Sequence, residues 1–502
     1  MEFKYYSLGL RMPGILRSRN RNFNSGPSPG NPHNRTRNKP KQPKDRFCDL
    51  SLFALWSMRA ETPYCSMNSL PVRVTPVDDE AGDRTSRNRQ FRTNAVTFFR
   101  QSGWIMMATG VNGLFMYAVH KFASRMPKGE YGVFATLLQV ITLTGIPAVG
   151  LQGLTASLAS MAVDSERIAI LTGTLRRLLG LTFALWLLAA IGSCLFGSRL
   201  FAALHIGRPL TWELTLLIGL ASLWRPILMG VLQGNQDFAW FGWAKMSEGV
   251  SRFIAVCVVV GGFGGYAPGA MGAVLFGMLV SLFACGWPLR RHFSGPATAI
   301  RYSEIVRLAG PLTIGLGVGI FMMSADMIFV QAYFPKEQTA YYAAAGMIGR
   351  ALIFITSTFN VVMFPKVARG AALGKNSDAR WHAVVACALC GAIGASACTL
   401  FPSAPLHLLY DNSFVEHSSP LVSWFTWCVL PLTLANLLIN DLMARSQFRV
   451  LPWLLGIAIA YGATLWFYHR SFLEIIRILG IYSLLFFFVA GWFAWKPSKK
   501  LD

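Results

Sequence analysis

The sequence predicts an all-α integral membrane protein with about twelve transmembrane helices, and three features carry this prediction. Hydrophobic residues make up 53% of the 502 residues and charged residues only 14%. The apolar residues come in runs of about 20, the length that a helix needs to cross the hydrocarbon core. Basic residues concentrate in every second loop, which is the topology signal of membrane proteins. Because lipid offers no partner for backbone N–H and C=O groups, these runs are expected to be helical.

Residues 1–95 differ from the rest of the chain. Here Arg and Lys are interleaved with Pro, Asn, Gly and Ser. Such a composition cannot bury enough apolar surface to offset its ordering entropy, so we expect a basic, disordered N-terminal segment. One hypothesis is that translation begins at Met58 or Met67, and the intact mass of the purified protein would test it.

From residue 98 onward the apolar runs define twelve expected spans. They lie at about 102–121, 132–161, 176–197, 211–233, 241–263, 268–289, 308–331, 339–365, 380–402, 420–444, 450–468 and 474–495. Proline within a helix removes a backbone hydrogen bond and favours a kink. Kinks are therefore predicted at Pro147, Pro226 and Pro311.

The loop charges predict the orientation of the chain. Loops after even-numbered spans, with the C-terminal tail, hold 17 Lys and Arg residues, against 8 after odd-numbered spans. Positive loops stay in the cytoplasm, so both termini are expected on the cytoplasmic face of the cell inner membrane. The net charge of +23 follows from these loops and from the N-terminal segment, and it does not indicate a nucleic-acid partner.

The chain also contains an internal repeat. Arg100-Gln-Ser-Gly103 at the start of the first span resembles Arg307-Leu-Ala-Gly310 at the start of the seventh. Pro127-Lys128 resembles Pro335-Lys336, with an offset of 208 residues. A repeat of six spans keeps its orientation, which predicts two parallel six-helix lobes related by an axis along the membrane normal. The predicted lobes are residues 96–296 and 297–502.

Several motifs together resemble a known family. They are Lys128-Gly-Glu-Tyr-Gly-Val-Phe-Ala135, Gly230-Val-Leu-Gln-Gly-Asn235, Ser324-Ala-Asp-Met-Ile-Phe-Val330, Tyr341-Tyr-Ala-Ala-Ala345 and Met363-Phe-Pro-Lys366. Residues 98–495 resemble the polysaccharide transporter (O-antigen flippase) family of the multidrug/oligosaccharidyl-lipid/polysaccharide exporter superfamily. The resemblance implies two lobes around a central cavity that opens alternately to each face. It also implies export of polyprenyl-pyrophosphate-linked oligosaccharides.

Three arginines within the spans are the candidate substrate-binding residues. Ionisable groups inside a membrane are costly and usually face a cavity. An arginine fork suits a pyrophosphate group, because it can donate two parallel hydrogen bonds to phosphate oxygens. Arg350, near the middle of the eighth span, is the leading candidate, and Arg225 and Arg252 follow it.

Two acidic residues are candidates for ion coupling or for neutralising these arginines. Asp326 could bind a coupling H⁺ or Na⁺, or it could be the counter-ion of Arg350. Glu248 lies four residues before Arg252, a spacing that places both on one helix face as an i, i+4 pair. The sequence leaves these alternatives open.

Small and amide side chains suggest helix packing. Asn360, Asn436 and Asn440 could bind sugars, but hydrogen bonding between helices is the preferred interpretation. Gly315 and Gly319 form a small-xxx-small pattern, which indicates close helix packing more often than gating.

Other function classes are weighed against transport. A drug/cation antiporter of the same superfamily would favour a cavity of carboxylates, whereas the charges here are mostly Arg. A polysaccharide polymerase or glycosyltransferase usually needs a large outer loop or an acidic catalytic motif. The sequence contains no phosphate-binding GxxxxGK[ST] motif. We therefore expect a monomeric transporter without enzymatic activity or cofactor, with the bilayer, a lipid-linked oligosaccharide and a coupling ion as its partners.

Overall fold

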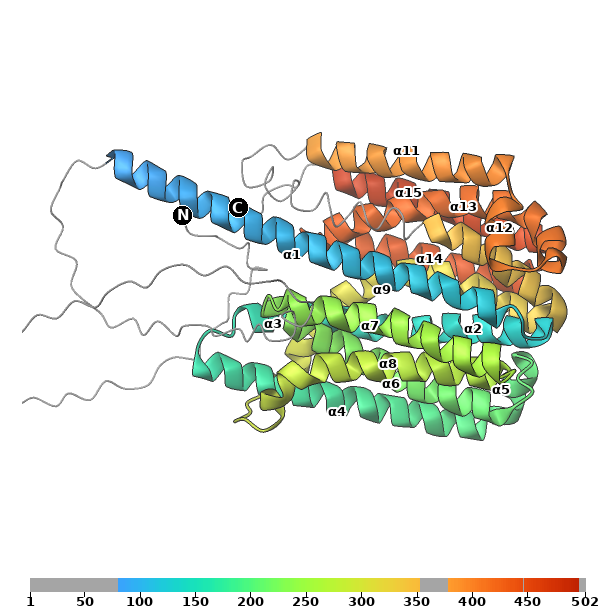
Figure 1. Ribbon diagram of the computed structural model, residues 1–502, viewed down its shortest axis with the longest axis horizontal. Coiled ribbons are helices and arrows are strands. Elements are labelled where there is room, and N and C mark those ends of the chain that lie inside the picture. The colour runs from blue at the N-terminus through green and yellow to red at the C-terminus, as the bar shows by residue number, and fades with distance from the viewer. Residues whose placement is uncertain (1–79, 353–377, 446, 496–502) are drawn as a thin grey trace, which may run out of the picture. The chain divides into compact units, whose positions relative to one another are not determined.

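The computed structural model describes residues 80–352, 378–445 and 447–495, and every regular element in these ranges is helical (Figure 1). Residues 1–79, Asn360 and the Met363–Lys366 motif lie outside the described residues. α1 begins at Glu80, so the end of the segment expected to be disordered, residues 80–95, belongs to a helix.

The first half of the chain comprises α1 to α8. Their bounds are α1 Glu80–Ala123, α2 Lys128–Thr144, α3 Ile146–Ser160, α4 Ser165–Leu195, α5 Gly197–Ala203, α6 Pro209–Gly234, α7 Phe238–Val256 and α8 Ala267–Leu289. A π-helical turn, Cys257–Gly262, extends α7, and a 3-10 turn, Arg290–Phe293, follows α8.

The second half begins with α9. Its helices are α9 Tyr302–Tyr333, residues 336–352, α11 Asp378–Leu400, α12 Ala404–Leu409, α13 Asn412–Ala444, α14 Leu451–Phe467 and α15 Phe472–Trp495. The short turn Phe448–Val450 precedes α14.

Each expected span contains a helix, or in the second span a bent pair of helices, and the eighth is described as far as residue 352. Seven helices are individually long and apolar enough to cross a membrane, namely α4, α6, α8, α9, α13, α14 and α15. The bent pair α2–α3 forms an eighth. The remaining four expected spans are occupied by α1, α7, residues 336–352 and α11. Large apolar side chains on the outside of these helices, such as Leu188, Ile459 and Phe488, remain exposed and suit contact with lipid.

The second span is broken, as Pro147 predicted. α2 and α3 meet at Gly145 with a bend of 42°. Pro147 lies in the first turn of α3, where its missing N–H costs no helical hydrogen bond. Pro226 and Pro311 instead lie inside the uninterrupted helices α6 and α9.

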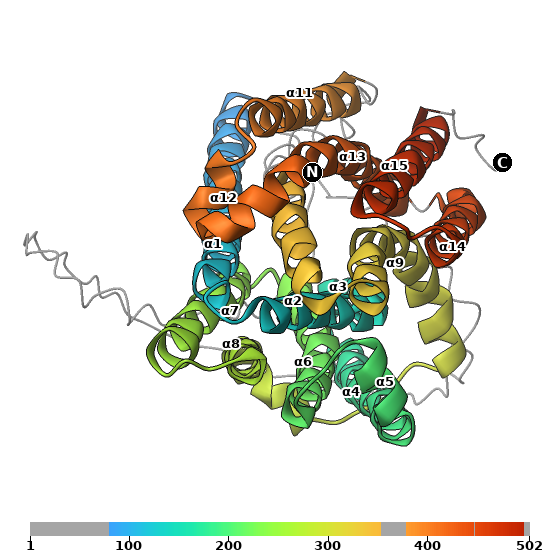
Figure 2. The same cartoon turned by 90° about the vertical axis from the view of Figure 1, so that its right-hand side faces the viewer.

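The helices pack as two groups (Figure 2). In the first half, α6 contacts α3, α4 and α8, and α7 packs along α8. In the second half, α13 contacts α11 and α15, while α14 packs against α9 and α15. The halves meet where α9 runs along α2 and α3. This contact is close, because a Cβ atom on Gly150 of α3 would lie 2.5 Å from the Ala309 carbonyl oxygen of α9.

The segment between the halves is bound to the first half. Thr298 N donates to Ala169 O at 3.0 Å, and Ile300 N donates to Thr174 Oγ1 at 3.3 Å. Arg176 Nη2 donates to Gly295 O at 2.8 Å. The connection is therefore fixed along α4 up to the start of α9. The lobe boundary between residues 296 and 297 stays a prediction, since the described residues from Arg89 onward form one compact unit.

Candidate functional site

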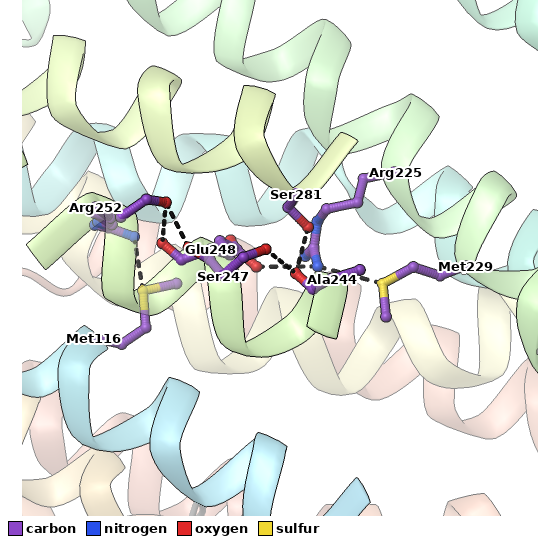
Figure 3. Close-up of polar contacts among 9 residues, drawn as sticks. Met116, Arg225, Met229, Ala244, Ser247, Glu248, Arg252 and Ser281 are labelled. Atoms are coloured by element: carbon purple, nitrogen blue, oxygen red, sulfur yellow. Dashed lines mark hydrogen bonds and ion pairs between the residues drawn. The ribbon is translucent and has the colours of Figure 1, made fainter. Parts of the chain in front are cut away.

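Three charged side chains of the first half gather where α6, α7 and α1 meet. Glu248 of α7 is buried and forms an ion pair with Arg225 of α6, at 3.0 Å between Oε2 and Nη1. Arg252 lies one turn further along α7 and is also buried. Its Nη1 donates to Sδ of Met116 in α1 at 3.1 Å. Figure 3 shows the two arginines on either side of Glu248.

This cluster contains more positive than negative charge. Lys245 lies on the same helix, three residues before Glu248. Three cations and one carboxylate give a formal charge of +2. An uncompensated charge is costly at this depth, so the cluster suits an anionic ligand.

Several N–H donors of these two arginines have a weak acceptor or none among the described residues. Arg225 Nη1 donates to Met229 Sδ at 3.4 Å, and a thioether sulfur is a weak acceptor. The Nε atoms of Arg225 and Arg252 are buried without a hydrogen-bond partner among the described residues. Arg225 keeps 19% of its side chain exposed. Oxygen atoms of an anion could replace the sulfur contacts and satisfy the free donors.

Arg350 occupies a different, self-neutralised arrangement in the second half. Its Nη2 lies 2.7 Å from both carboxylate oxygens of Asp326, and its Nε donates to Met323 O at 2.9 Å. Tyr342 OH donates to Asp326 Oδ2 at 2.8 Å. Asp326 has no exposed surface. Of the two alternatives for Asp326, this geometry fits the counter-ion, and Arg225 and Arg252 replace Arg350 as the leading candidate ligands.

The expected i, i+4 ion pair between Glu248 and Arg252 is wrong, because the partner of Glu248 is a different arginine. Glu248 pairs with Arg225, twenty-three positions away in sequence, because the Arg252 guanidinium extends toward Met116 (Figure 3). Arg252 still acts electrostatically on the same carboxylate. The three residues thus form one cluster, whereas the sequence analysis treated Arg225 separately from the pair of Glu248 and Arg252.

The packing interpretation is confirmed for Asn436, Gly315 and Gly319, whereas the exposed Asn440 bonds within its own helix α13 instead of to another helix. Asn440 Nδ2 donates to Asn436 O at 2.8 Å, and the Asn436 amide contacts Met323 of α9. A Cβ atom on Gly319 would clash with the Asn436 side chain, and one on Gly315 would clash with Met443 of α13. This face of α9 therefore packs closely on α13.

A second polar site joins the two halves at one end of the bundle. Lys128 Nζ donates to Tyr341 OH at 2.6 Å, and Lys336 Nζ lies 3.7 Å from Glu130 Oε1. Lys128 and Lys336 occupy equivalent positions of the repeat, and each reaches the opposite half. We call the contacts of Lys128, Glu130, Tyr131, Lys336, Tyr341 and Tyr410 the clasp. Because it follows the first and seventh spans, it lies at the end that the loop charges predict to be the outer one.

A buried histidine extends the clasp toward the arginine cluster. His120 Nδ1 of α1 lies 2.9 Å from Tyr131 OH of α2, and Tyr131 OH lies 2.7 Å from Tyr410 OH. All three residues are buried. Tyr410 precedes α13 in the second half, and burial raises the pKa of its phenol. Arg252 acts electrostatically on His120. The hydrogen-bonded series thus connects the surroundings of Arg252 with the second half.

Further contacts between the halves surround the clasp. Ser124 Oγ donates to Leu409 O at 3.2 Å. Gln331 at the end of α9 accepts from Thr136 Oγ1 at 3.1 Å and donates to Leu204 O at 3.0 Å. His205 Nδ1 lies 2.9 Å from Gln331 O. This end of the bundle is closed by hydrogen bonds and ion pairs in addition to apolar packing.

The sequence contained part of the signal for the clasp. The Lys128–Ala135 motif contains Lys128, Glu130 and Tyr131. The repeated Pro-Lys pair contains Lys128 and Lys336. His120, Met116 and Tyr410 carry no local signal, because their roles depend on partners in other helices. Within the ranges that the structure describes, no group of three or more His, Cys, Asp or Glu residues could hold a metal ion.

Comparisons with known proteins identify the fold. No family model and no curated protein match the chain. The chain is similar to the inward-facing conformation of a multidrug resistance MATE family transporter of the MOP superfamily, with a TM-score of 0.59 and 15% identity over 76% of this chain and 94% of that one. The chain is also similar to the outward-facing conformation of a multidrug resistance MATE family transporter, with a TM-score of 0.51 and 13% identity over 79% of this chain and 94% of that one.

A third solved structure carries the same fold. It is a MOP superfamily transporter from Pyrococcus furiosus, with a TM-score of 0.52 and 14% identity over 78% of this chain and 94% of that one. At these identities the similarity shows the fold. The chain therefore has the fold of these transporters, which confirms the all-α membrane architecture.

Proposed function

We propose that this protein is an alternating-access transporter that flips a polyprenyl-pyrophosphate-linked oligosaccharide from the cytoplasmic to the outer leaflet of the cell inner membrane. The observation that carries the proposal is the excess of positive charge around Glu248, where Arg252 is buried and Arg225 and Lys245 are partly buried. In this proposal the protein acts as a monomer with cytoplasmic termini and carries out no chemical reaction on its cargo.

The cluster has the chemistry that a pyrophosphate headgroup requires. A ligand carrying two negative charges would balance the formal charge of the cluster, and its oxygens would accept from the free Nε donors. Charge-assisted hydrogen bonds of this kind are stronger than the thioether contacts that they would replace. In this scheme Glu248 holds Arg225 in place until the anion arrives, and Asp326 holds Arg350 as a structural pair.

The closed clasp supports an inward-facing state. The clasp joins the halves at the expected outer end, and the similarity to the inward-facing transporter exceeds that to the outward-facing one, 0.59 against 0.51. Cargo would then enter from the cytoplasmic side and leave after the clasp has opened.

A drug/cation antiporter is the competing proposal, because two of the similar structures are multidrug resistance transporters. A cationic drug would be repelled by the positive cluster. The Pyrococcus furiosus transporter is described as having a binding pocket of reverse polarity that suggests a different function. A change of pocket polarity on this fold therefore has a parallel, and the local charge favours an anion here.

Binding of farnesyl pyrophosphate to the purified protein tests the proposal, with farnesol as the uncharged control ligand. We expect only the pyrophosphate to bind in calorimetry. Arg252→Gln should weaken it about 10- to 100-fold, since a hydrogen bond to a charged group contributes about 1.5–3 kcal/mol. Glu248→Gln should strengthen binding, because it removes the negative charge from the cluster.

The matched control is Arg199→Gln, an exposed arginine in α5 that should leave the affinity unchanged. Equal binding of farnesol and farnesyl pyrophosphate would contradict an anion site. Tighter binding of a lipophilic cation than of the pyrophosphate would support the antiporter instead.

A further inference from the structure

Four observations around the clasp remain outside the cargo-binding scheme. His120 is 2% exposed, yet it hydrogen-bonds to Tyr131, and Tyr131 hydrogen-bonds across the halves to Tyr410. The lysines Lys128 and Lys336 close the same end. A buried titratable group therefore lies directly behind the contacts that must break for the outer end to open.

We propose that His120 is the proton-coupling residue of this protein, and that proton uptake by His120 opens the clasp. The inference rests on the transport function proposed above, and it names the coupling ion and the residue that carries it. Histidine is the side chain whose charge changes most readily near neutral pH.

The closed state disfavours a protonated His120. A second proton on the ring creates a positive charge among buried groups, and such a charge is costly unless it is paired. Tyr131 of α2 contacts His120, Tyr410 lies beyond Tyr131, and Arg252 of α7 contacts Met116, one helical turn before His120. Tyr131 can accept one hydrogen bond, but Arg252 repels the new charge. The protonated ring is therefore favoured in a state where water reaches it.

Opening the clasp supplies that water. Separation of Tyr131 from Tyr410 exposes the outer end of α1, so His120 can take one proton from the outer aqueous phase. A group that binds a proton only in the open state shifts the opening equilibrium by up to about tenfold per pH unit as the pH falls.

The position of Arg252 links this step to the cargo. Arg252 contacts Met116, and His120 follows Met116 by one helical turn in α1. An anion bound at Arg252 offsets the positive charge that opposes protonation of His120. A loaded site therefore takes up the proton more easily than an empty one, which couples cargo binding to opening at the outer end.

Hydrogen exchange of the full chain in lipid nanodiscs tests this inference without any cargo. Exchange of peptides covering residues 124–136 and 405–418 is compared at about pH 7.5 and about pH 5.5, corrected with an unstructured peptide. We expect faster exchange in both segments at the lower pH. His120→Gln, which keeps a hydrogen-bonding side chain but cannot become charged, should abolish this difference.

Two other histidines near the clasp provide matched controls. His205 bonds to Gln331 O across the halves, and His417 stacks on Tyr341. His205→Gln and His417→Gln should keep the pH difference. A wild-type protein without that difference would overturn the proposal even if His120→Gln fails to fold, and so would its loss in His417→Gln but not in His120→Gln. Hydrogen exchange reports on conformation and not on binding. The pH difference can therefore be absent while pyrophosphate binds, and it can be present while pyrophosphate does not bind.

Discussion

The ion pair of Arg350 and Asp326 joins α9 to the helix of residues 336–352. Both side chains are buried, and Tyr342 and the Met323 carbonyl complete the hydrogen bonds. Removing one partner of such a pair leaves an uncompensated charge, whereas replacing both partners costs much less. Comparing the single replacement with the double one therefore shows whether Arg350 is part of a structural ion pair or binds a ligand.

Arg350→Ala should lower the free energy of unfolding by about 3–5 kcal/mol, because Asp326 is left charged and buried. The double variant Arg350→Met with Asp326→Asn should recover most of that loss. Thermal unfolding in detergent measures both. The exposed Arg477 is the control, and Arg477→Ala should change the stability by less than about 0.5 kcal/mol. A stable Arg350→Ala that loses only transport would return Arg350 to the cargo site.

The residues that were easiest to identify from the sequence are those whose burial is costly whatever their neighbours are. A charged side chain inside an apolar run is conspicuous by itself, so Arg225, Arg252, Arg350 and Asp326 were all found. Their partners were harder, because a partner on another helix leaves no periodic signal. Glu248 was assigned to Arg252 by helical spacing, yet it lies beside Arg225 of α6. Met116, with which Arg252 makes its sulfur contact, had no charge to mark it.

At the scale of elements, the contact of α3 with α9 sets the distance between the halves. Gly150 faces Ala309 and Thr313 so closely that a methyl group cannot fit without a backbone shift. Introducing a methyl group into a packed contact typically costs about 1–3 kcal/mol. Gly310 lies on the same helix α9, but a Cβ atom added there would meet no other atom within 4 Å among the described residues.

We expect Gly150→Ala to lower the unfolding temperature in detergent through this clash. Gly310→Ala should leave it unchanged or raise it, because Ala is favoured over Gly in a helix interior by up to about 1 kcal/mol. If both substitutions had the same effect, helix propensity rather than the contact between the halves would govern these positions.

Helices were predictable from the sequence because hydrophobic length and proline position are local properties. The bend beside Pro147 was expected, because proline is tolerated in the first turn of a helix but not in its interior and so marks the start of α3. The short helices α5 and α12 were missed, because elements of seven and six residues produce no apolar run of membrane length. The docking of residues 295–300 on α4 also had no signal, since it uses backbone atoms of the connecting segment.

At the scale of the whole molecule, the repeat and the clasp describe the same symmetry. Lys128 and Lys336 begin the second helix of each half, 208 residues apart, and each contacts the other half. Equivalent residues that each contact the opposite half are expected near an axis relating two like-oriented repeats. The sequence predicted the number and order of the helices, but the pairing of the halves depends on tertiary contacts that no single segment encodes.

The orientation of this arrangement in the membrane gives the last prediction. Six spans per half bring residue 296 and the C-terminus to the same side, and the excess of basic residues in even-numbered loops predicts that this side is cytoplasmic. Residue 335 follows the seventh span and lies beside the clasp, so it should be outside. Alkaline phosphatase fused after residue 335 should therefore be active, whereas fusions after residues 296 and 502 should be inactive.

Green fluorescent protein at the same three positions should give the opposite result, which controls for expression of each fusion. Active phosphatase after residue 502 together with an inactive fusion after residue 296 would mean an odd number of spans in the second half. Activity after both, with an inactive fusion after residue 335, would invert the whole molecule. Inversion would place the clasp at the cytoplasmic face, so the closed end would exclude cargo from the side where a lipid-linked precursor is made, and the direction of transport proposed above would fail with it.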